Sequence, residues 1–404
     1  MLYGWCSLYM VRIGISPLLA PIREEFHLTY SQVGLLAMAI FVTYAIMQFP
    51  AGYLGDRLGR RTLLLLGIFG WTVITFLTGF CTAFASLFGL RLLTGFFQGA
   101  YFGNERPLVA YYTPGDQKAS GQGITLMGQG MGMALGMILS GFIADHLGWR
   151  WVFILYAFPS LVAGLLVLNY LREPQNLQPA GAMNPDSTFS FRHVFITRNL
   201  WFIYLSCFSN GYAFGLLGSW APSILLETGL QGLTTPSLLA GFLGFTGMAG
   251  LYLTGRWSDR LTLRSGTRKS ILIIYMLISF ALTTFMGTAI SFQSSAFPVA
   301  VSIIFSSFFL WGFFPPLYAL VTEVVPQRTL GTAFGFMNLL TYTGSMLASW
   351  LTGWLRDLSG SFAWGMYCSG ILIFAGIIFV FLIKADSGSR WESHEGIHGV
   401  SSRR

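Results

Sequence analysis

Two arginines lie inside long apolar stretches of the sequence, where a charged side chain costs about 2.5–3.5 kcal/mol on insertion scales. Arg12 stands near the middle of the first stretch, and Arg91 stands in the stretch at 87–112. A guanidinium presents a planar fork of donors that matches a carboxylate, and it loses its proton with difficulty. Because no carboxylate lies beside either arginine, they predict a positive site for a small organic anion. The alternative is that Arg91 extends outward to the membrane surface and Arg12 caps a neighbouring helix.

Polar residues recur on the same stretch as Arg91 at intervals of seven. Gln98 and Glu105 follow it at this spacing, which is within about 20° of two full helical turns, so the three side chains share one helix face. Arg106 comes next in the sequence but points about 100° away. Glu105 is a candidate proton site, or else a salt-bridge partner near the cytoplasmic interface, and the sequence leaves both open.

Further polar side chains in apolar stretches are candidates for substrate binding. They are Tyr9, Tyr44, Asn210, Tyr212 and Asn338. A lone amide or tyrosine in a membrane helix more often makes a helix–helix hydrogen bond than a ligand contact. Asn210 and Asn338 are favoured because their stretches, the seventh and the eleventh, are expected to line one face of a second helical bundle.

The composition places these residues in a membrane protein. Of 404 residues, 54% are apolar and only 9% are charged, against about 25% charged in an average globular chain. This excludes a soluble multi-domain enzyme, a disordered protein and a disulfide-stapled secreted domain. The sequence contains no nucleotide loop, metal-like spacing or nucleophile–base pair, so we expect neither an enzyme nor a cofactor or metal.

Twelve apolar runs are long enough to cross a bilayer, which needs about 20 helical residues. They lie at 3–21, 33–53, 63–84, 87–112, 121–144, 151–171, 199–226, 236–256, 270–290, 297–323, 331–354 and 364–384. With the N-terminus inside, 17 of the 23 Lys and Arg residues fall in cytoplasmic segments. This charge distribution predicts that both termini are cytoplasmic, in the inner membrane if the protein is bacterial.

The longest polar gap divides the runs into six and six. We expect an N-terminal bundle at 1–172, a cytoplasmic linker at 173–198, a C-terminal bundle at 199–384 and a disordered tail at 385–404. The first run begins directly after Met1 without a basic segment or cleavage site. It is therefore predicted to span the membrane rather than to be a signal peptide, and we expect a short cytoplasmic leader to precede it.

The two halves repeat each other at three places. GYLGDRLGRR follows the second run and GRWSDR follows the eighth, 203 residues later. Pro114 and Pro326 open similar loops 212 residues apart, and GFIADHLG and GWLRDLSG end the fifth and eleventh runs at the same offset. A duplicated six-helix unit predicts two bundles related by a pseudo-two-fold axis, with the substrate site between them at mid-membrane.

The first of these repeats carries a family signature. It comprises Gly52, Asp56, Arg57, Gly59, Arg60 and Arg61, with a weaker copy at Gly255, Asp259 and Arg260. It resembles the loop signature of the major facilitator superfamily, and the resemblance covers the chain to about residue 384. It implies an all-α membrane protein with twelve transmembrane helices in two pseudo-symmetric bundles. We expect a gate in which Asp56 faces a helix N-terminus and Gly52 permits tight packing; the alternative is simple topogenic charge.

Further segments are similar to the anion:cation symporter branch of that superfamily. They are YMVR ending at Arg12, the run from Arg91 to Pro114, GWRWVF at 148–153 and GSWAPSILL at 218–226. The resemblance implies that Arg12 and Arg91 bind an organic anion, with a co-transported proton or sodium ion. Val11 and Gln98, however, stand where many of those symporters have acids. Proton symport, facilitated uptake and exchange therefore all remain open.

Two other functions compete with anion transport. Exporters of the superfamily often have a proline after the glycine pair of the fifth span, but Gly132 and Gly136 are followed by Met137, which lowers the rank of a drug or metabolite exporter. A non-transporting sensor is less favoured because the linker and tail are too short for a domain. The expected partners are a small anion and lipid, with no nucleic acid, and the chain is expected to be a monomer.

Overall fold

The computed structural model describes residues 1–113, 118–173, 197–265, 268–324 and 330–383, which are helical nearly throughout. The first half of the chain forms α1 (Leu2–Ile13), the short 3-10 helix η1 (Ser16–Leu18), α2 (Leu19–Glu25), α3 (Tyr30–Leu58), α4 (Arg60–Thr78), α5 (Phe84–Tyr112), α6 (Lys118–Leu147) and α7 (Trp149–Tyr170). The second half forms α9 (Arg198–Glu227), α10 (Thr234–Ser265), α11 (Lys269–Ser291), α12 (Ala296–Gly312), α13 (Phe314–Val324), α14 (Leu330–Ser359) and α15 (Ala363–Leu382).

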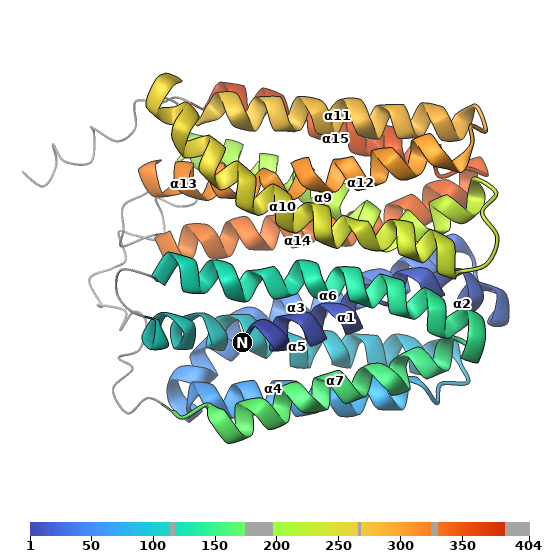
Figure 1. Cartoon of the computed structure of the whole chain (residues 1–404), viewed down its shortest axis with the longest axis horizontal. Helices are drawn as coiled ribbons and strands as arrows, with labels where there is room; N and C mark the ends of the chain where they lie inside the picture. Colours follow the sequence, from blue (N-terminus) through green and yellow to red (C-terminus); the bar gives the residue numbers. More distant parts are fainter. Residues whose placement is uncertain (114–117, 174–196, 266–267, 325–329, 384–404) are drawn as a thin grey trace, which may run out of the picture.

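The helices lie roughly parallel and form two bundles, one from each half of the chain (Figure 1). In the first bundle, α1 packs on α6, α3 on α5, and α4 on α5 and α7. In the second, α9 packs on α14 and α15, α10 on α12, and α11 on α15. The bundles meet where α3 packs on α14 and α6 packs on α10, two interfaces that the internal repeat relates to each other.

Ten helical segments in the described part of the chain are long and apolar enough to cross a membrane. The helices α5 and α14 are not among the ten, although at 29 and 30 residues they are as long as their neighbours. At about 1.5 Å per residue both exceed the 30 Å of a bilayer core. The helix α5 carries three charges, Arg91, Glu105 and Arg106, so it must be shielded from lipid by the helices around it.

The first predicted span is broken rather than continuous. The helix α1 ends at Ile13, and the chain continues through η1 into α2. Pro17 stands in η1 and has no backbone N–H, so the helical ladder cannot pass it unbroken. The span expected over 3–21 is therefore present as Leu2–Glu25, and it contains a 3-10 segment that the sequence analysis did not predict.

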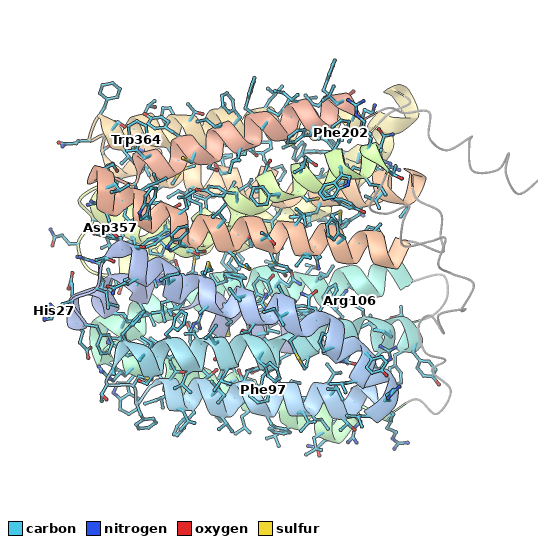
Figure 2. All side chains as sticks on the ribbon, turned by 180° about the vertical axis from the view of Figure 1, so that it is seen from behind. His27, Phe97, Arg106, Phe202, Asp357 and Trp364 are labelled. Atoms are coloured by element: carbon cyan, nitrogen blue, oxygen red, sulfur yellow. The ribbon has the colours of Figure 1, made fainter. Side chains whose placement is uncertain are left out.

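The two ends of the molecule differ in how closely the bundles approach. We call the end that carries the α2–α3 turn, with His27, the outer end (Figure 2), and the end where α3 meets α4 the inner end. In the outer half, a methyl group added to Gly34 would strike Ser349 of the other bundle. Near the inner end, one added to Gly52, Gly123 or Gly335 would meet nothing within 4 Å. At these positions the two bundles are in contact in the outer half, and the glycines near the inner end face open space.

Candidate functional site

Arg12 is buried among aromatic rings between α1, α3 and α5. Its side chain is 1% exposed. The guanidinium carbon lies 3.9 Å from the ring centre of Tyr44, 5.1 Å from that of Tyr9 and 5.8 Å from that of Phe41. Its Nε donates to Oε1 of Gln98 at 3.1 Å. Rings of this kind attract a cation through their faces, so they hold the charge without neutralising it.

The two terminal nitrogens of Arg12 have no hydrogen-bond partner among the described residues. Buried polar groups in proteins are hydrogen-bonded in the great majority of cases, and an unmet donor on a charged group is expensive. Nη1 and Nη2 carry two N–H groups each. The side chain therefore offers a set of buried, charged donors that a planar anion would satisfy.

Arg91 has a different environment, although it is equally buried. Its Nη1 donates to the carbonyl of Val11 and its Nη2 to the carbonyl of Arg12, each at 3.1 Å. These carbonyls belong to the last turn of α1, where a helix leaves its carbonyls unpaired and its dipole favours a positive charge. Arg91 thus holds the broken end of α1. The alternative in which Arg91 extends outward to the membrane surface is therefore wrong. The same alternative gave Arg12 the role of capping a neighbouring helix, but it is Arg91 that caps one.

Gln98 links the two arginine-bearing helices. Its amide oxygen accepts from Arg12, and its Nε2 donates to the carbonyl of Leu8 at 3.3 Å. The amide is fully buried and both of its ends are engaged. Gln98 therefore fixes the orientation of the Arg12 side chain without carrying a charge, and it faces α1 together with Arg91, as their spacing predicts.

The second bundle reaches this cluster through Tyr342 of α14. Its ring centre lies 5.2 Å from that of Tyr44 and 6.1 Å from that of Phe41, so the aromatic wall beside Arg12 is shared between the bundles. Sequence analysis did not identify Phe41. The signal was its position three residues before Tyr44, which places both rings on one face of a helix.

The other second-bundle candidates lie apart from this cluster or at its edge. Asn210 donates its side-chain amide to the carbonyl of Leu310 at 3.1 Å, which joins α9 to α12. Tyr212 is fully buried on α9. Asn338 is half-buried on α14, one turn before Tyr342, and so it lies on the same side of that helix.

Glu105 and Arg106 form an ion pair toward the inner end of α5. Oε2 of Glu105 lies 2.7 Å from Nε of Arg106, and the Glu105 side chain is fully buried. The rings of Trp5 and Phe102 lie within 5.6 Å of the Arg106 guanidinium carbon. The salt-bridge partner expected for Glu105 is therefore present, and it is the neighbouring residue.

The signature loop between α3 and α4 is organised by a carboxylate at the end of the first bundle. Gly59 adopts φ 93°, a value that favours glycine. Glu173 then accepts from the backbone N–H groups of Arg60 and Arg61, at 2.9 and 2.7 Å. A carboxylate at a helix N-terminus satisfies unpaired donors and matches the dipole. Glu173 was not identified in the sequence because it follows the last helix of the bundle, far from the motif.

The remaining motif residues give a mixed result. The side chains of Asp56 and Asp259 lie outside the described residues. Arg57 and Arg260 are exposed. A methyl group added to Gly103 of α5 would lie 3.6 Å from the Cα of Gly52, and one added to Gly55 would strike the Asn104 side chain. The copy at Gly255 is loose, since an added methyl group would lie 3.8 Å from Pro315.

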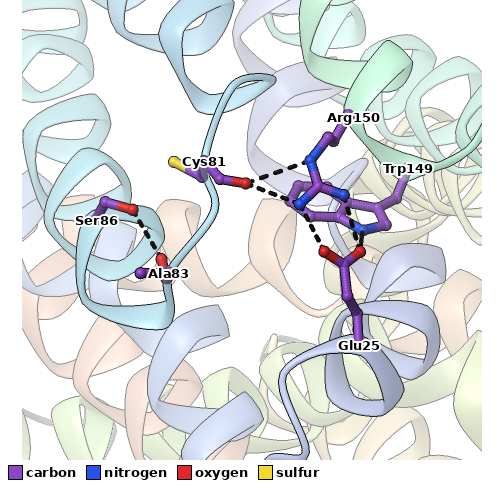
Figure 3. A network of polar contacts seen from close by, with 6 residues as sticks. All are labelled: Glu25, Cys81, Ala83, Ser86, Trp149 and Arg150. Atoms are coloured by element: carbon purple, nitrogen blue, oxygen red, sulfur yellow. Dashed lines mark hydrogen bonds and ion pairs between the residues drawn. The ribbon is translucent and has the colours of Figure 1, made fainter.

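A polar network at the outer end ties the broken first span to α7 (Figure 3). Glu25, the last residue of α2, accepts from both terminal nitrogens of Arg150 at 2.8 and 2.6 Å, and from the indole N–H of Trp149 at 2.7 Å. Arg150 also donates to the carbonyl of Cys81. All of these residues belong to the first bundle, so the network makes that bundle rigid at its outer end.

Comparisons with known proteins agree with this architecture. The sequence profile of the Major Facilitator Superfamily matches residues 2–273 and 237–401. The chain is 28% identical to a D-galactonate transporter of Escherichia coli O6:H1, over 93% of this chain and 92% of that one. It is 25% identical to a hexuronate transporter of Bacillus subtilis, over 94% and 92%.

A solved structure shows the same fold. A bacterial homolog of the human lysosomal transporter Spinster, in an inward-facing and occupied conformation, superposes with a TM-score of 0.79 at 17% identity, over 95% of each chain. The profile match, the full-length similarity to transporters and the shared fold identify a transporter rather than an enzyme. This chain belongs to the Major Facilitator Superfamily.

Proposed function

We propose that the protein carries a small organic anion, a carboxylate or sugar acid, across the membrane by alternating access. The observation that carries the proposal is the buried Arg12 guanidinium, whose two terminal nitrogens have no partner among the described residues. A carboxylate would accept two parallel hydrogen bonds from them. The names of the relatives support this substrate class, because D-galactonate and hexuronates are sugar acids.

The residues around Arg12 take separate roles in this proposal. Arg12 binds the carboxylate, Gln98 orients it and Arg91 positions it by holding the end of α1. The ring of Tyr44, whose centre lies 3.9 Å from the Arg12 guanidinium carbon, is proposed to contact the bound substrate. From the second bundle, Asn338 contacts the polar end of the substrate, because it lies one turn from the Tyr342 ring.

A thermal-shift screen tests the substrate class. Purified protein is heated with monocarboxylates, dicarboxylates, sugar acids and inorganic anions at two pH values. A ligand present at 100 times its Kd adds about 2.7 kcal/mol of stability by mass action. We expect a sugar acid or simple carboxylate to raise the melting temperature. No response to any organic anion would contradict the proposal.

Arg12→Gln separates binding from folding in the same assay. It removes a buried charge that has no acceptor for its terminal nitrogens among the described residues, so the ligand-free variant should melt at the same temperature or higher. The shift caused by the anion should become smaller, because the loss of two charged hydrogen bonds, about 3–6 kcal/mol in all, lowers the affinity roughly 100-fold or more. Arg198→Gln, which alters an exposed arginine outside the signature loop, is the matched control and should retain the full shift.

Coupling to protons is proposed to run through Glu105. Among the described membrane helices it is the fully buried carboxyl group, and Gln98 cannot titrate. Glu105→Gln should preserve exchange of anion between equal pools but abolish accumulation driven by a pH gradient. Accumulation by this variant at the wild-type level would exclude Glu105 as the coupling group.

The outer end is proposed to face away from the cytoplasm, because most of the basic residues lie at the inner end. Gln293 is exposed in the outer turn between α11 and α12. A cysteine placed there should react with a membrane-impermeant maleimide in intact cells. Reaction only after the cells are opened would show the opposite orientation and contradict this proposal.

A further inference from the structure

Two carboxylates at the outer end each cross from one bundle to the other. Asp145, in the last turn of α6, accepts from the backbone N–H of Leu233 at 2.8 Å and from that of Thr234 at 2.6 Å. The hydroxyl of Thr234 donates to the same carboxylate. Asp145 belongs to the first bundle, and the residues that it binds open α10 of the second.

Asp357 makes the reciprocal contact. It lies in the last turn of α14 at the outer end (Figure 2) and accepts from the N–H groups of Tyr30 and Ser31, at 2.9 and 2.7 Å. These two residues open α3 of the first bundle. Thr29 and Gln32 cap each other's N–H groups, so the local cap leaves the N–H groups of Tyr30 and Ser31 to a partner from outside the helix.

The two contacts are copies of one motif. Asp145 and Asp357 are 212 residues apart, the offset of the internal repeat, and each follows a glycine by four residues. A methyl group added to Gly141 would strike Ser237 of α10, and one added to Gly353 would strike the carbonyl of Tyr30. In each copy the glycine allows close contact between two helices of different bundles, α6 with α10 and α14 with α3. The aspartate one turn later then caps the N-terminus of α10 or α3.

We propose that these residues form a duplicated outer latch that stabilises the inward-facing state. Alternating access requires the bundles to separate at the outer end, which would withdraw both carboxylates from the helix N-termini. Four backbone donors would then lose a charged acceptor and α3 and α10 would lose the negative charge at their positive ends. The latch therefore sets the proportion of inward- and outward-facing molecules without contacting the substrate.

The acceptors distinguish this latch from a simple ion pair. Each aspartate accepts from two adjacent backbone N–H groups and uses both of its carboxylate oxygens. An asparagine of the same shape keeps one acceptor but loses the charge and the second. Loss of an N-terminal cap costs about 1 kcal/mol, so each replacement should change the equilibrium between the closed and open outer end by roughly a factor of five. The two sites lie in separate interfaces, so their effects should multiply.

Distance measurements between the bundles test the latch without any substrate. Spin labels are placed on Thr82→Cys in the α4–α5 turn and Gln293→Cys in the α11–α12 turn, both exposed at the outer end, in a variant whose native cysteines are replaced. Protein with both aspartates in nanodiscs should show mainly the short distance of a closed outer end. Asp145→Asn or Asp357→Asn should raise the ratio of long to short distances about fivefold, and the double variant about 25-fold.

Two further variants make the test decisive. Glu25→Gln weakens hydrogen bonds of similar length to those of the latch, but these lie within the first bundle. This variant should leave the distances between the spin labels unchanged. Gly353→Ala forces the bundles apart sterically while keeping both aspartates. This variant should increase the distances between the spin labels. An unchanged distance distribution in both the double aspartate variant and Gly353→Ala would overturn the proposal. An equal response to Glu25→Gln would overturn it too.

Discussion

Arg12 is a charge that the protein buries and then leaves incompletely bonded. Its Nε is held by Gln98 and its face by three rings, but its two terminal nitrogens meet no acceptor among the described residues. Arg91 is equally buried, but its terminal nitrogens donate hydrogen bonds to the carbonyls at the end of α1. Two arginines that look equivalent in the sequence therefore differ in whether their terminal nitrogens are hydrogen-bonded to described residues.

Gln98→Glu should make anion binding depend on pH. At low pH the new carboxyl group is protonated and neutral, like the amide that it replaces, and Arg12 stays available. As the pH rises and the group ionises, it pairs with Arg12 across the 3.1 Å contact and competes with the anion. The anion affinity of the variant should fall with rising pH. The affinity of wild type should show no such fall, because the amide of Gln98 does not titrate. The Kd at pH 5 and pH 8 checks this, and parallel profiles for both proteins would contradict it.

Residues of this kind were predictable from the sequence to an unequal degree. Arg12 and Arg91 were identifiable because ionisable groups are rare in apolar spans. Phe41 was harder to identify, because its spacing from Tyr44 is a weak signal in a chain with 16% aromatic residues, whose partners depend on tertiary packing. The role of Glu173 was also hidden, because a carboxylate that caps a distant helix leaves no local pattern.

At the scale of elements, the break after α1 places Arg12. The helix α1 stops at Ile13, its last carbonyls are held by Arg91, and the chain resumes as η1 and α2. Hydropathy predicted the span but not the 3-10 segment within it, because hydropathy averages over about 19 residues and a local change of helix type leaves the apolar count unchanged. Pro17 was the available signal.

Gly14→Ala should disturb this element and, with it, the site. An added methyl group would strike the carbonyl of Met10 and lie 2.6 Å from the Tyr156 ring. Overpacking of this kind costs about 1–3 kcal/mol, so both the ligand-free melting temperature and the shift caused by the anion should fall. Gly89→Ala in α5, where the methyl group would meet open space, is the control and should be neutral or stabilising by about 0.5–1 kcal/mol. Equal melting temperatures for the two variants would refute this role for Gly14.

At the scale of the whole molecule, the internal repeat predicted the two bundles and the fold class. It could not predict which end is closed, because the two states share nearly all contacts within each bundle and differ by a few kcal/mol at the interfaces. Only the structure shows the contact between the bundles at Gly34 and the open space at Gly52, Gly123 and Gly335. The aligned motifs ending at Asp145 and Asp357 were visible in the sequence, but only the structure shows that each one crosses to the other bundle.

The central claim, that the chain is an anion carrier built around Arg12, is tested most directly by counterflow. Proteoliposomes are loaded with the unlabelled anion that gives the largest thermal shift, and the labelled anion is added outside. Wild type and Arg198→Gln should accumulate label transiently, because only a carrier exchanges ligand across a sealed bilayer. Arg12→Gln should exchange at least 10-fold more slowly, consistent with the loss of charged hydrogen bonds. Exchange by Arg12→Gln at the wild-type rate would contradict the account.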